Sequence, residues 1–377
     1  MKVLMVNTPS ATRFRGGDLT QMRKSAEALR RRGVEVVESF DVEPDGRGFD
    51  VAHVFNLRTI QSTPRQVRHL KDQGIPVALS PIYLNPSFAL WGTRVVKSIF
   101  RGERTDDEIE RLLLKLSGRT AMIRTSGGAV LSATAENRPR GHYDRIQRAT
   151  LDGVDYLMPN SILEMNALVR TLGRFDLPFT VVPYAADPAT FLDPDPEPFV
   201  RRFGLRDFVL QAGRIEASKN QVLLAWALRG LDVPLVLIGG NMQNRYEQWC
   251  RQHGPKHLHI IDHLSSDTLA AAYGAARVHV LPSWIETCGL STMEAALADC
   301  SVVASTAGYE IEYFRDLAYY CDPSDHASIR TAVERSLDHY DRDQERRLDL
   351  KRLILSEYTW DRAADLMLRC YGRMGGN

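Results

Sequence analysis

The segment of the chain best suited to chemistry is 282–298, which reads PSWIETCGLSTMEAALA. A loop carrying Glu286 and Gly289 precedes a helical pattern that begins near Leu290. Glycine lets a ligand approach the backbone, and the free amides of a helix N-terminus favour an anion. Glu286 and Glu294 would flank that anion as carboxylates that accept hydrogen bonds from vicinal hydroxyls. The pattern therefore fits a ligand that carries phosphate between two polyols.

The same residues also have a purely structural interpretation. Ser291 and Glu294 match a capping box, which by itself accounts for Glu294. Glu286 would then be an ordinary residue of a surface loop. The choice between the two interpretations depends on what else the chain carries.

A second candidate segment is QAGRIEASKN, 211–220, which directly follows an apolar run. Its Arg214 and Lys219 lie where a strand turns into a helix, so both side chains can converge on one anion. A diphosphate needs such compensation when no metal is present, and arginine offers a planar fork while lysine offers a point charge. The alternative is a solvated basic loop.

A third candidate is RFRGGDLTQ, 13–21, after the first apolar run of the chain. Gly16 and Gly17 give a tight turn into a helix N-terminus, which again suits an anion. The segment is not GxGxxG, so a dinucleotide-binding fingerprint is not supported. A plain turn is the alternative.

Short apolar runs alternate with amphipathic stretches along the chain, a βαβ rhythm that predicts parallel sheets covered by helices. The rhythm breaks in a stretch rich in proline and aspartate and then restarts. It predicts an N-terminal domain over 1–185, a linker at 186–198, a second domain over 199–358 and a terminal helix within 359–377 that packs back on the first domain. The predicted strands are 2–7, 34–39, 51–55, 76–80, 155–159, 179–183, 208–212, 234–239, 258–262, 278–282, 301–305 and 318–322.

Composition excludes several classes of protein. The 377 residues carry a net charge of +1, which gives no support for binding nucleic acid mainly through phosphates. No apolar run approaches the roughly 20 residues that span a bilayer. The five cysteines are odd in number and contain no CxxC pair, which favours reduced thiols over disulfides or a zinc site. We therefore expect a cytoplasmic protein.

Taken together and in this order, the three segments resemble the family-4 glycosyltransferases, a retaining group with the GT-B fold. Glu286-x7-Glu294 matches that family's EX7E motif, and Arg214-x4-Lys219 matches its diphosphate motif. The resemblance implies an α/β protein with two Rossmann-like doubly wound domains that face an interdomain cleft. It also implies a nucleoside-diphosphate sugar as donor, with neither a metal nor another cofactor.

The resemblance assigns roles to particular residues. Arg214 and Lys219 would bind the diphosphate and stabilise the leaving group, so they are catalytic candidates together with Glu286, which would face the donor sugar. Glu294 would hold the ribose. The remaining donor-binding candidates are Gly16, Gly17, Thr287, Cys288, Gly289 and Leu290.

Two departures from the family pattern are visible. Many members carry Phe-Gly where this chain has Cys288-Gly289, and many place a histidine where SPIYLNP, 80–86, stands here. His53 lies earlier and is expected to be a core histidine. Asp193-Pro194-Asp195 looks like a metal-binding DxD motif, but it falls in the proline-rich linker and is interpreted as linker.

The acceptor side is predicted from fewer residues. Tyr83, Asn85 and Trp91 are the acceptor candidates. The stretch 88–104 combines seven large apolar residues with four basic ones, which fits either a helix packed on its domain or peripheral contact with an anionic membrane surface.

The function predicted from the sequence is retaining sugar transfer to a glycan, a lipid-linked or a small hydroxyl acceptor. Glycan or glycoconjugate assembly would be its setting by family analogy, at the inner face of the membrane if the peripheral contact exists. Two alternatives stay open. One is a nucleotide-sugar epimerase or hydrolase of the same fold, and the other is a catalytically silent protein that binds nucleotide sugars.

Overall fold

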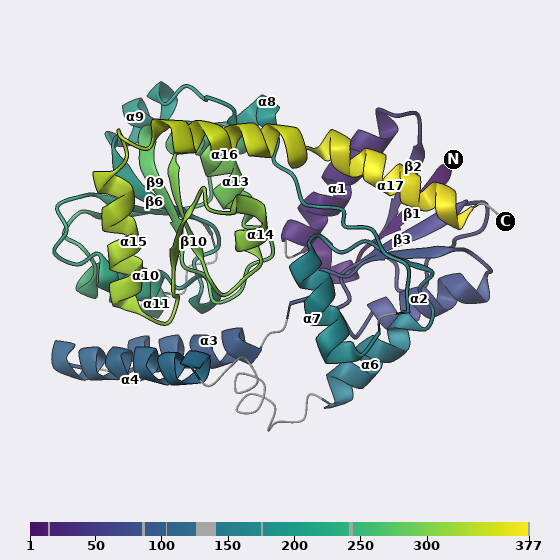
Figure 1. The fold of residues 1–377 in the computed structure, drawn as a ribbon, viewed down its shortest axis with the longest axis horizontal. Coiled ribbons are helices and arrows are strands. Elements are labelled where there is room, and N and C mark those ends of the chain that lie inside the picture. The colour runs from purple at the N-terminus through teal and green to yellow at the C-terminus, as the bar shows by residue number, and fades with distance from the viewer. Residues whose placement is uncertain are drawn as a thin grey trace. The chain divides into compact units, whose positions relative to one another are not determined.

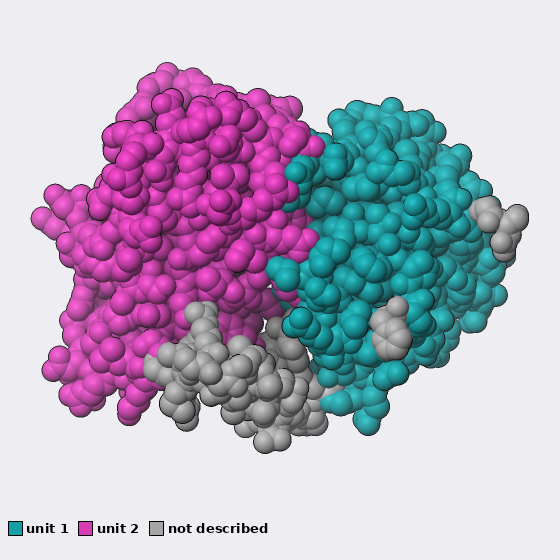
Figure 2. Space-filling view, viewed as in Figure 1, with its two compact units in different colours: residues 1–85, 139–185, 357–377 teal, residues 86–138, 186–356 magenta. Residues whose placement is uncertain are grey.

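The computed structural model of the chain forms two compact units, which Figure 2 distinguishes by colour. Unit 1 contains residues 1–85, 139–185 and 357–377, and unit 2 contains residues 86–138 and 186–356. The residues that the structure describes are 1–13, 16–84, 87–102, 104–125, 141–174, 176–240 and 244–375.

Unit 1 is built on a five-stranded parallel sheet with strand order β2-β1-β3-β4-β5. The central strands are buried on both faces, as expected for a parallel sheet covered by helices on each side (Figure 1). The predicted strand at 179–183 is wrong, because Phe179 makes only an isolated bridge with Leu157. The elements are β1 (Lys2–Val6), α1 (Gly17–Arg30), β2 (Glu35–Ser39), β3 (Val51–Phe55), α2 (Thr63–Asp72), β4 (Val77–Ser80), α6 (Gly141–Leu151), β5 (Tyr156–Leu157), α7 (Ile162–Leu172) and α17 (Trp360–Met374), with a 3-10 turn at Pro9–Thr12.

Unit 2 is built on a six-stranded parallel sheet with strand order β11-β10-β9-β6-β7-β8. All six predicted strands of this half are present. The strands are β6 (Phe208–Ala212), β7 (Leu235–Ile238), β8 (Leu258–Ile261), β9 (Ala276–Leu281), β10 (Ser301–Ser305) and β11 (Tyr319–Cys321). The helices are α3 (Ser87–Phe100), α4 (Asp106–Thr125), α8 (Pro188–Phe191), α9 (Glu197–Phe203), the 3-10 turn η2 (Ala217–Lys219), α10 (Gln221–Ala227), α11 (Asn244–His253), α12 (Ser266–Ala275), α13 (Leu290–Leu297), α14 (Glu310–Phe314), α15 (His326–Asp338) and α16 (Gln344–Glu357).

The division of the chain differs from the expected boundaries. Residues 86–138 lie inside the predicted N-terminal domain, yet they group with unit 2, where α3 and α4 pack beside each other and α3 contacts η2, α10 and α11. The predicted linker 186–198 is also part of unit 2 and contains α8. Its Asp193 pairs with Lys351 at 2.6 Å, which gives this aspartate a structural partner.

The apolar face of α3 packs on the core of unit 2. Of the seven apolar side chains counted in 88–104, three are buried and three are partly buried against that core, and only Leu90 is exposed. The stretch is thus a packed helix, but it packs on unit 2 and not on the N-terminal domain in which it was predicted. Among the described residues, no helix is long and apolar enough to cross a membrane.

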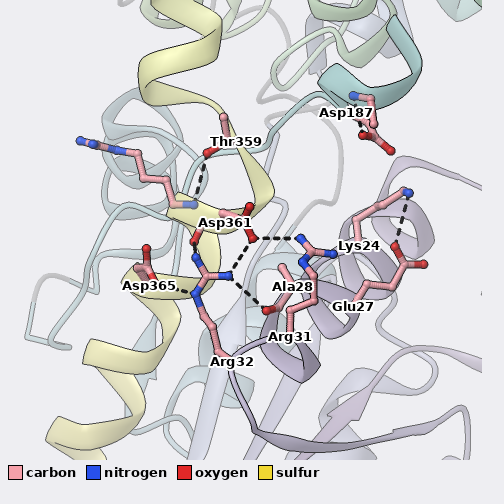
Figure 3. Close-up of polar contacts among 11 residues, drawn as sticks. Lys24, Glu27, Ala28, Arg31, Arg32, Asp187, Thr359, Asp361 and Asp365 are labelled. Atoms are coloured by element: carbon pink, nitrogen blue, oxygen red, sulfur yellow. Dashed lines mark hydrogen bonds and ion pairs between the residues drawn. The ribbon is translucent and has the colours of Figure 1, made fainter.

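Helix α17 returns the end of the chain to unit 1, where it packs on α1. Arg32, just after α1, binds Asp365 at 2.5 Å and both the carboxylate and the backbone carbonyl of Asp361 at 2.7 Å (Figure 3). Inside, the hydroxyl of Tyr371 lies 2.7 Å from a ring nitrogen of His53. One arginine and one buried tyrosine therefore hold α17 from its two sides.

Replacing Arg32 by alanine should loosen α17 selectively. Three charge-assisted hydrogen bonds from one partly buried guanidinium justify an expected local loss of about 1–2 kcal/mol. The measurement is amide hydrogen exchange over α17, which should accelerate by roughly tenfold. Arg31→Ala is the matched control, because Arg31 is more exposed and makes one ion pair with Asp361. Equal effects of the two variants would contradict the assignment.

Candidate active site in unit 2

The candidate residues of unit 2 gather where three neighbouring strands end. In a parallel sheet all carboxyl ends share one edge, and β9 lies between β6 and β10. The segments that follow these three strands carry the predicted Lys219 at the end of η2, the predicted Glu286 in a loop and Glu310 at the start of α14. The sheet order therefore brings together residues that are more than 90 positions apart, from 214 to 310.

Backbone hydrogen bonds fix these loops to one another. The amide of Trp284 donates to the carbonyl of Ser218 at 2.9 Å, which joins the β9 loop to η2. The amide of Tyr309 donates to the carbonyl of Glu286 at 3.1 Å, which joins the β10 loop to the β9 loop. Asn220 adds a side-chain bond to the carbonyl of Pro282 at 3.0 Å. The three loops thus form one hydrogen-bonded layer.

Lys219 and Glu286 meet in a direct ion pair at the centre of this layer. The lysine side chain is 19% exposed and the glutamate 12% exposed, so both charges are largely withdrawn from water. A pair in such surroundings interacts more strongly than a surface pair, because solvent screens it less. The candidate segments 211–220 and 282–298 are therefore in contact.

Arg214 is near Lys219 in sequence but has a different partner. Its guanidinium pairs with Glu216 at 3.0 Å and is 55% exposed. The hydroxyl of Ser218 donates to the same carboxylate oxygen at 2.6 Å. Arg214 and Lys219 thus pair with different carboxylates, and the guanidinium is the more exposed of the two cations.

Glu294 lies in α13 and accepts a hydrogen bond from the hydroxyl of Tyr273 at 3.2 Å. Burial raises the pKa of this carboxyl from 4.5 to about 7, the hydrogen bond from Tyr273 opposes that shift, and the charge of Asp187 adds to it. The capping-box interpretation does not hold, because the N-cap residue of α13 is Gly289 and makes no side-chain cap. Glu294 is therefore a titratable group near neutral pH.

Glu310 is a buried acid that the sequence motifs do not include. Its carboxylate accepts the amide of Ser305 at 3.1 Å and the hydroxyl of Thr292 at 3.3 Å. Burial, with the charge of Glu286 as second cause, raises its pKa well above the usual range. The sequence signal is a strand followed by a short loop and a helix with acidic residues in its first turn, a pattern that does not recur after β9.

The Glu310 side chain leaves no room for a side chain at position 289. The residue has a φ of +63°, and a Cβ placed on it would lie 2.2 Å from a carboxylate oxygen of Glu310. Gly289 is also the N-cap of α13, whose first amides point out of the helix end. Glycine is therefore required here for two reasons: the positive φ of the turn and the space that the Glu310 side chain occupies.

His279 is a second functional candidate that sequence reasoning missed. It lies fully buried in β9, and neither ring nitrogen has a hydrogen-bond partner among the described residues. Burial, assisted by the charge of Lys219, lowers its pKa to about 3, so the ring is neutral at physiological pH. No local pattern marks it, since VHVLP is an ordinary buried strand.

The other donor-binding candidates divide between the two units. Thr287 and Leu290 are partly exposed beside the start of α13, whereas the side chain of Cys288 is buried and burial raises the pKa of its thiol. In unit 1, Gly16 is the N-cap of α1 and Gly17 its first residue. These glycines do form a helix N-terminus, as predicted.

The acceptor candidates fall in both units. The side chain of Tyr83 is buried in the core of unit 1. Trp91 belongs to unit 2 and packs edge-on against Trp284. Asn85 lies outside the described residues. His53 is a core histidine, fully buried, with its pKa lowered to about 3 by burial.

The described residues contain no cluster of three or more histidines, cysteines, aspartates or glutamates arranged to hold a metal ion. The cations at the site are protein side chains, Lys219 and Arg214. An anionic ligand would meet these two groups together with the N-terminus of α13.

Comparison with known proteins shows what the second unit is similar to. Residues 199–352 match the family model of glycosyl transferases group 1. A relative described as an uncharacterized glycosyltransferase of Methanocaldococcus jannaschii is 28% identical over 184 residues, which cover 46% of this chain and 47% of the relative. The chain thus matches about half of that relative's length.

Solved structures show the fold of the whole chain. Sucrose-phosphate synthase from Thermosynechococcus elongatus superposes with a TM-score of 0.73, at 14% identity and with 99% of both chains covered. The Anabaena protein HepE, solved with UDP-glucose, gives a TM-score of 0.70 at 13% identity, over 99% of this chain and 100% of that one. The fold is GT-B, with two Rossmann-like units.

Gly289→Ala should destabilise unit 2 by more than backbone strain alone explains. The matched control is Gly204→Ala, because Gly204 has nearly the same φ of +68° but no atom lies within 4 Å of the position that its added methyl would take. We expect about 1 kcal/mol for the control and at least about 1 kcal/mol more for Gly289→Ala, measured by urea unfolding. Adding Glu310→Ala should reduce the extra loss, since it removes two of the three atoms nearest to the methyl and leaves only the hydroxyl oxygen of Thr292. Equal losses at the two glycines would contradict this explanation.

Glu294→Gln should change how stability depends on pH. The pKa of Glu294 is raised from 4.5 to about 7, so the folded protein holds more protons in this window and its stability falls as pH rises through it. The variant lacks that fall, so its melting temperature relative to wild type should increase from about pH 4.5 to pH 7. Tyr273→Phe removes the opposing hydrogen bond and should extend the fall to higher pH. A constant difference between Glu294→Gln and wild type would contradict the assigned shift.

Proposed function

We propose that the chain is a retaining glycosyltransferase that moves a sugar from a nucleoside-diphosphate sugar to a hydroxyl acceptor. The observation that carries the proposal is the contact of Lys219 with Glu286 beside the N-terminus of α13. The family match over 199–352 and the structural likeness to a protein solved with UDP-glucose support it. Uridine diphosphate is therefore the first nucleotide to test.

The chemistry follows from the charges at the site. Breaking the bond between the anomeric carbon and the diphosphate oxygen leaves the electron pair on that oxygen. Lys219 and Arg214 would stabilise the resulting negative charge, and the α13 amides would add their dipoles. The ion pair with Glu286 offsets the desolvation free energy of the partly buried Lys219 ammonium. The ammonium is therefore held in place before the donor binds.

Donor binding would exchange one partner of Lys219 for another. A diphosphate competes with Glu286 for the ammonium, and a released Glu286 carboxylate can accept hydrogen bonds from hydroxyls of the transferred sugar. Two neighbours restrict the positions that the Glu286 carboxylate can take. The amide of Tyr309 binds the backbone carbonyl of Glu286, and Glu310 is a second acid buried nearby. Glu286 is thus assigned to the sugar and Lys219 to the phosphates.

Glu294 is assigned to the ribose of the donor. Its carboxylate is oriented by Tyr273 and would accept bonds from the two ribose hydroxyls. In the proposed reaction the acceptor hydroxyl attacks from the face that the diphosphate leaves. A phosphate oxygen of the departing group takes the hydroxyl proton, and no metal is required.

The first test is a thermal-shift screen of the whole chain against UDP, GDP, ADP and dTDP, with and without EDTA. We expect UDP to raise the melting temperature selectively, because ligand binding to the folded state stabilises it by mass action, and EDTA to leave the shift unchanged. Loss of the shift in EDTA would contradict metal independence. No shift with any nucleotide at millimolar concentration would contradict the donor assignment.

Variants test the roles of the two cations. Lys219→Ala and Arg214→Ala should each lower the transfer rate by roughly 100-fold or more, because each removes charge that stabilises the leaving group. The matched control is Arg251→Ala, which breaks an exposed ion pair with Glu247 on α11 and should leave transfer unchanged. Wild-type rates in both site variants would overturn the diphosphate assignment. Sugar release or isomerisation without an acceptor would favour the hydrolase or epimerase, and binding without turnover would favour the silent protein.

A further inference from the structure

We propose that helix α3 is a positioning element for the Lys219–Glu286 pair, and that Gly92 and Trp284 are the contact through which it acts. The chain encodes α3 directly after strand β4 of unit 1, yet the helix belongs to unit 2. The proposal rests on the function proposed above for its kinetic readout, and a second readout is independent of that function.

The contact between α3 and Trp284 is unusually close. Trp284 is 1% exposed, and a Cβ placed on Gly92 would lie 2.1 Å from two atoms of its indole ring. Phe88 and Trp91 complete the packing, with ring centroids 5.2 and 5.9 Å from that of Trp284. A residue larger than glycine at position 92 therefore has to displace the indole or the helix.

Trp284 connects this contact to both members of the ion pair. It lies two residues before Glu286, and its amide donates to the carbonyl of Ser218, the residue before Lys219. Helix α3 also packs directly on η2, which ends at Lys219. A displaced indole would thus move the loops of both charges.

A second route leads from the end of α3 to the same loop. Phe100 packs edge-on against Tyr246 at 5.0 Å between ring centroids. The hydroxyl of the buried Tyr246 lies 3.3 Å from the carbonyl of Glu216, which holds Arg214. The C-terminal end of the helix therefore supports Glu216, which lies between Arg214 and Lys219.

The α3–α4 segment is anchored on unit 2 away from the site as well. Asp106 pairs with Arg229 at 2.7 Å, and Glu110 accepts the indole N–H of Trp226 at 3.0 Å. His326 lies 3.1 Å from the other oxygen of Glu110. These anchors lie in and just after α10 and at the start of α15 rather than on the site loops, so a change at Gly92 can shift Trp284 while α4 stays attached.

The decisive experiment compares Gly92→Ala with Gly102→Ala in the full chain. Gly102 is the matched glycine of the same segment, and a Cβ there would meet nothing closer than 3.4 Å. Hydrogen exchange should accelerate in Gly92→Ala over 213–219 and 282–289, while α12 and the Gly102 variant stay at wild-type rates. Acceleration confined to 87–125 would overturn the proposal, whether or not the chain transfers sugar.

Kinetics give the second readout once transfer has been observed. We expect Gly92→Ala to lower kcat by about tenfold at a temperature where the variant is fully folded, with KM for the acceptor unchanged. The double variant Gly92→Ala with Trp284→Phe should recover most of that loss, because the smaller ring makes room for the methyl. A lower melting temperature with wild-type kcat, or no recovery in the double variant, would show that α3 has a structural role only. If Gly92→Ala does not fold, Trp284→Phe alone should lower kcat about threefold, with hydrogen exchange over 87–125 unchanged. A wild-type kcat in Trp284→Phe would overturn the proposal.

Discussion

The candidate site of unit 2 centres on the ion pair between Lys219 and Glu286, which forms only if the loops that carry the two charges are held together. Three acidic side chains lie around the ends of β9 and β10, and two of them, Glu294 and Glu310, have their pKa raised mainly by burial. Glu286 has a cation in contact, so it is the acid of the three whose charge is directly compensated. That compensation requires the β6 and β9 loops to be held at a fixed separation. The hydrogen bond from Trp284 to Ser218 and the packing of α3 supply that constraint.

Much of this site could be predicted from the sequence. Apolar runs predict the parallel strands, and loops that follow neighbouring strands meet at one sheet edge, so Lys219 and Glu286 come together without any knowledge of side chains. Partners within the loops were harder to predict. Arg214 and Lys219 were both assigned to a diphosphate, and in the structure Arg214 pairs with Glu216 while Lys219 pairs with Glu286. The position of an acidic residue in a basic loop does not indicate which of the neighbouring cations it will pair with.

The placement of 86–138 could not be derived from the sequence, because an amphipathic pattern specifies an apolar face but not what covers that face. The same pattern fits a membrane surface, the first unit or the second. The residue that decides it, Trp284, is almost 200 positions further along the chain. Glu310 was not predicted as a site residue for a related reason. Its importance comes from contacts with Ser305 and Thr292, which only the folded sheet edge creates.

Two glycines show that close approach of a ligand and close packing of a side chain can both require glycine at a position. Gly289 precedes a helix in a loop with acidic residues, which predicts close approach of a ligand to the backbone. In the structure the space beside it is filled by the carboxylate of Glu310, so a side chain is excluded for an internal reason as well. Gly92 is excluded from bearing a side chain by the indole of Trp284. Gly289 and Trp284 both lie within a few residues of Glu286, so packing at these two positions constrains the loop that carries this carboxylate.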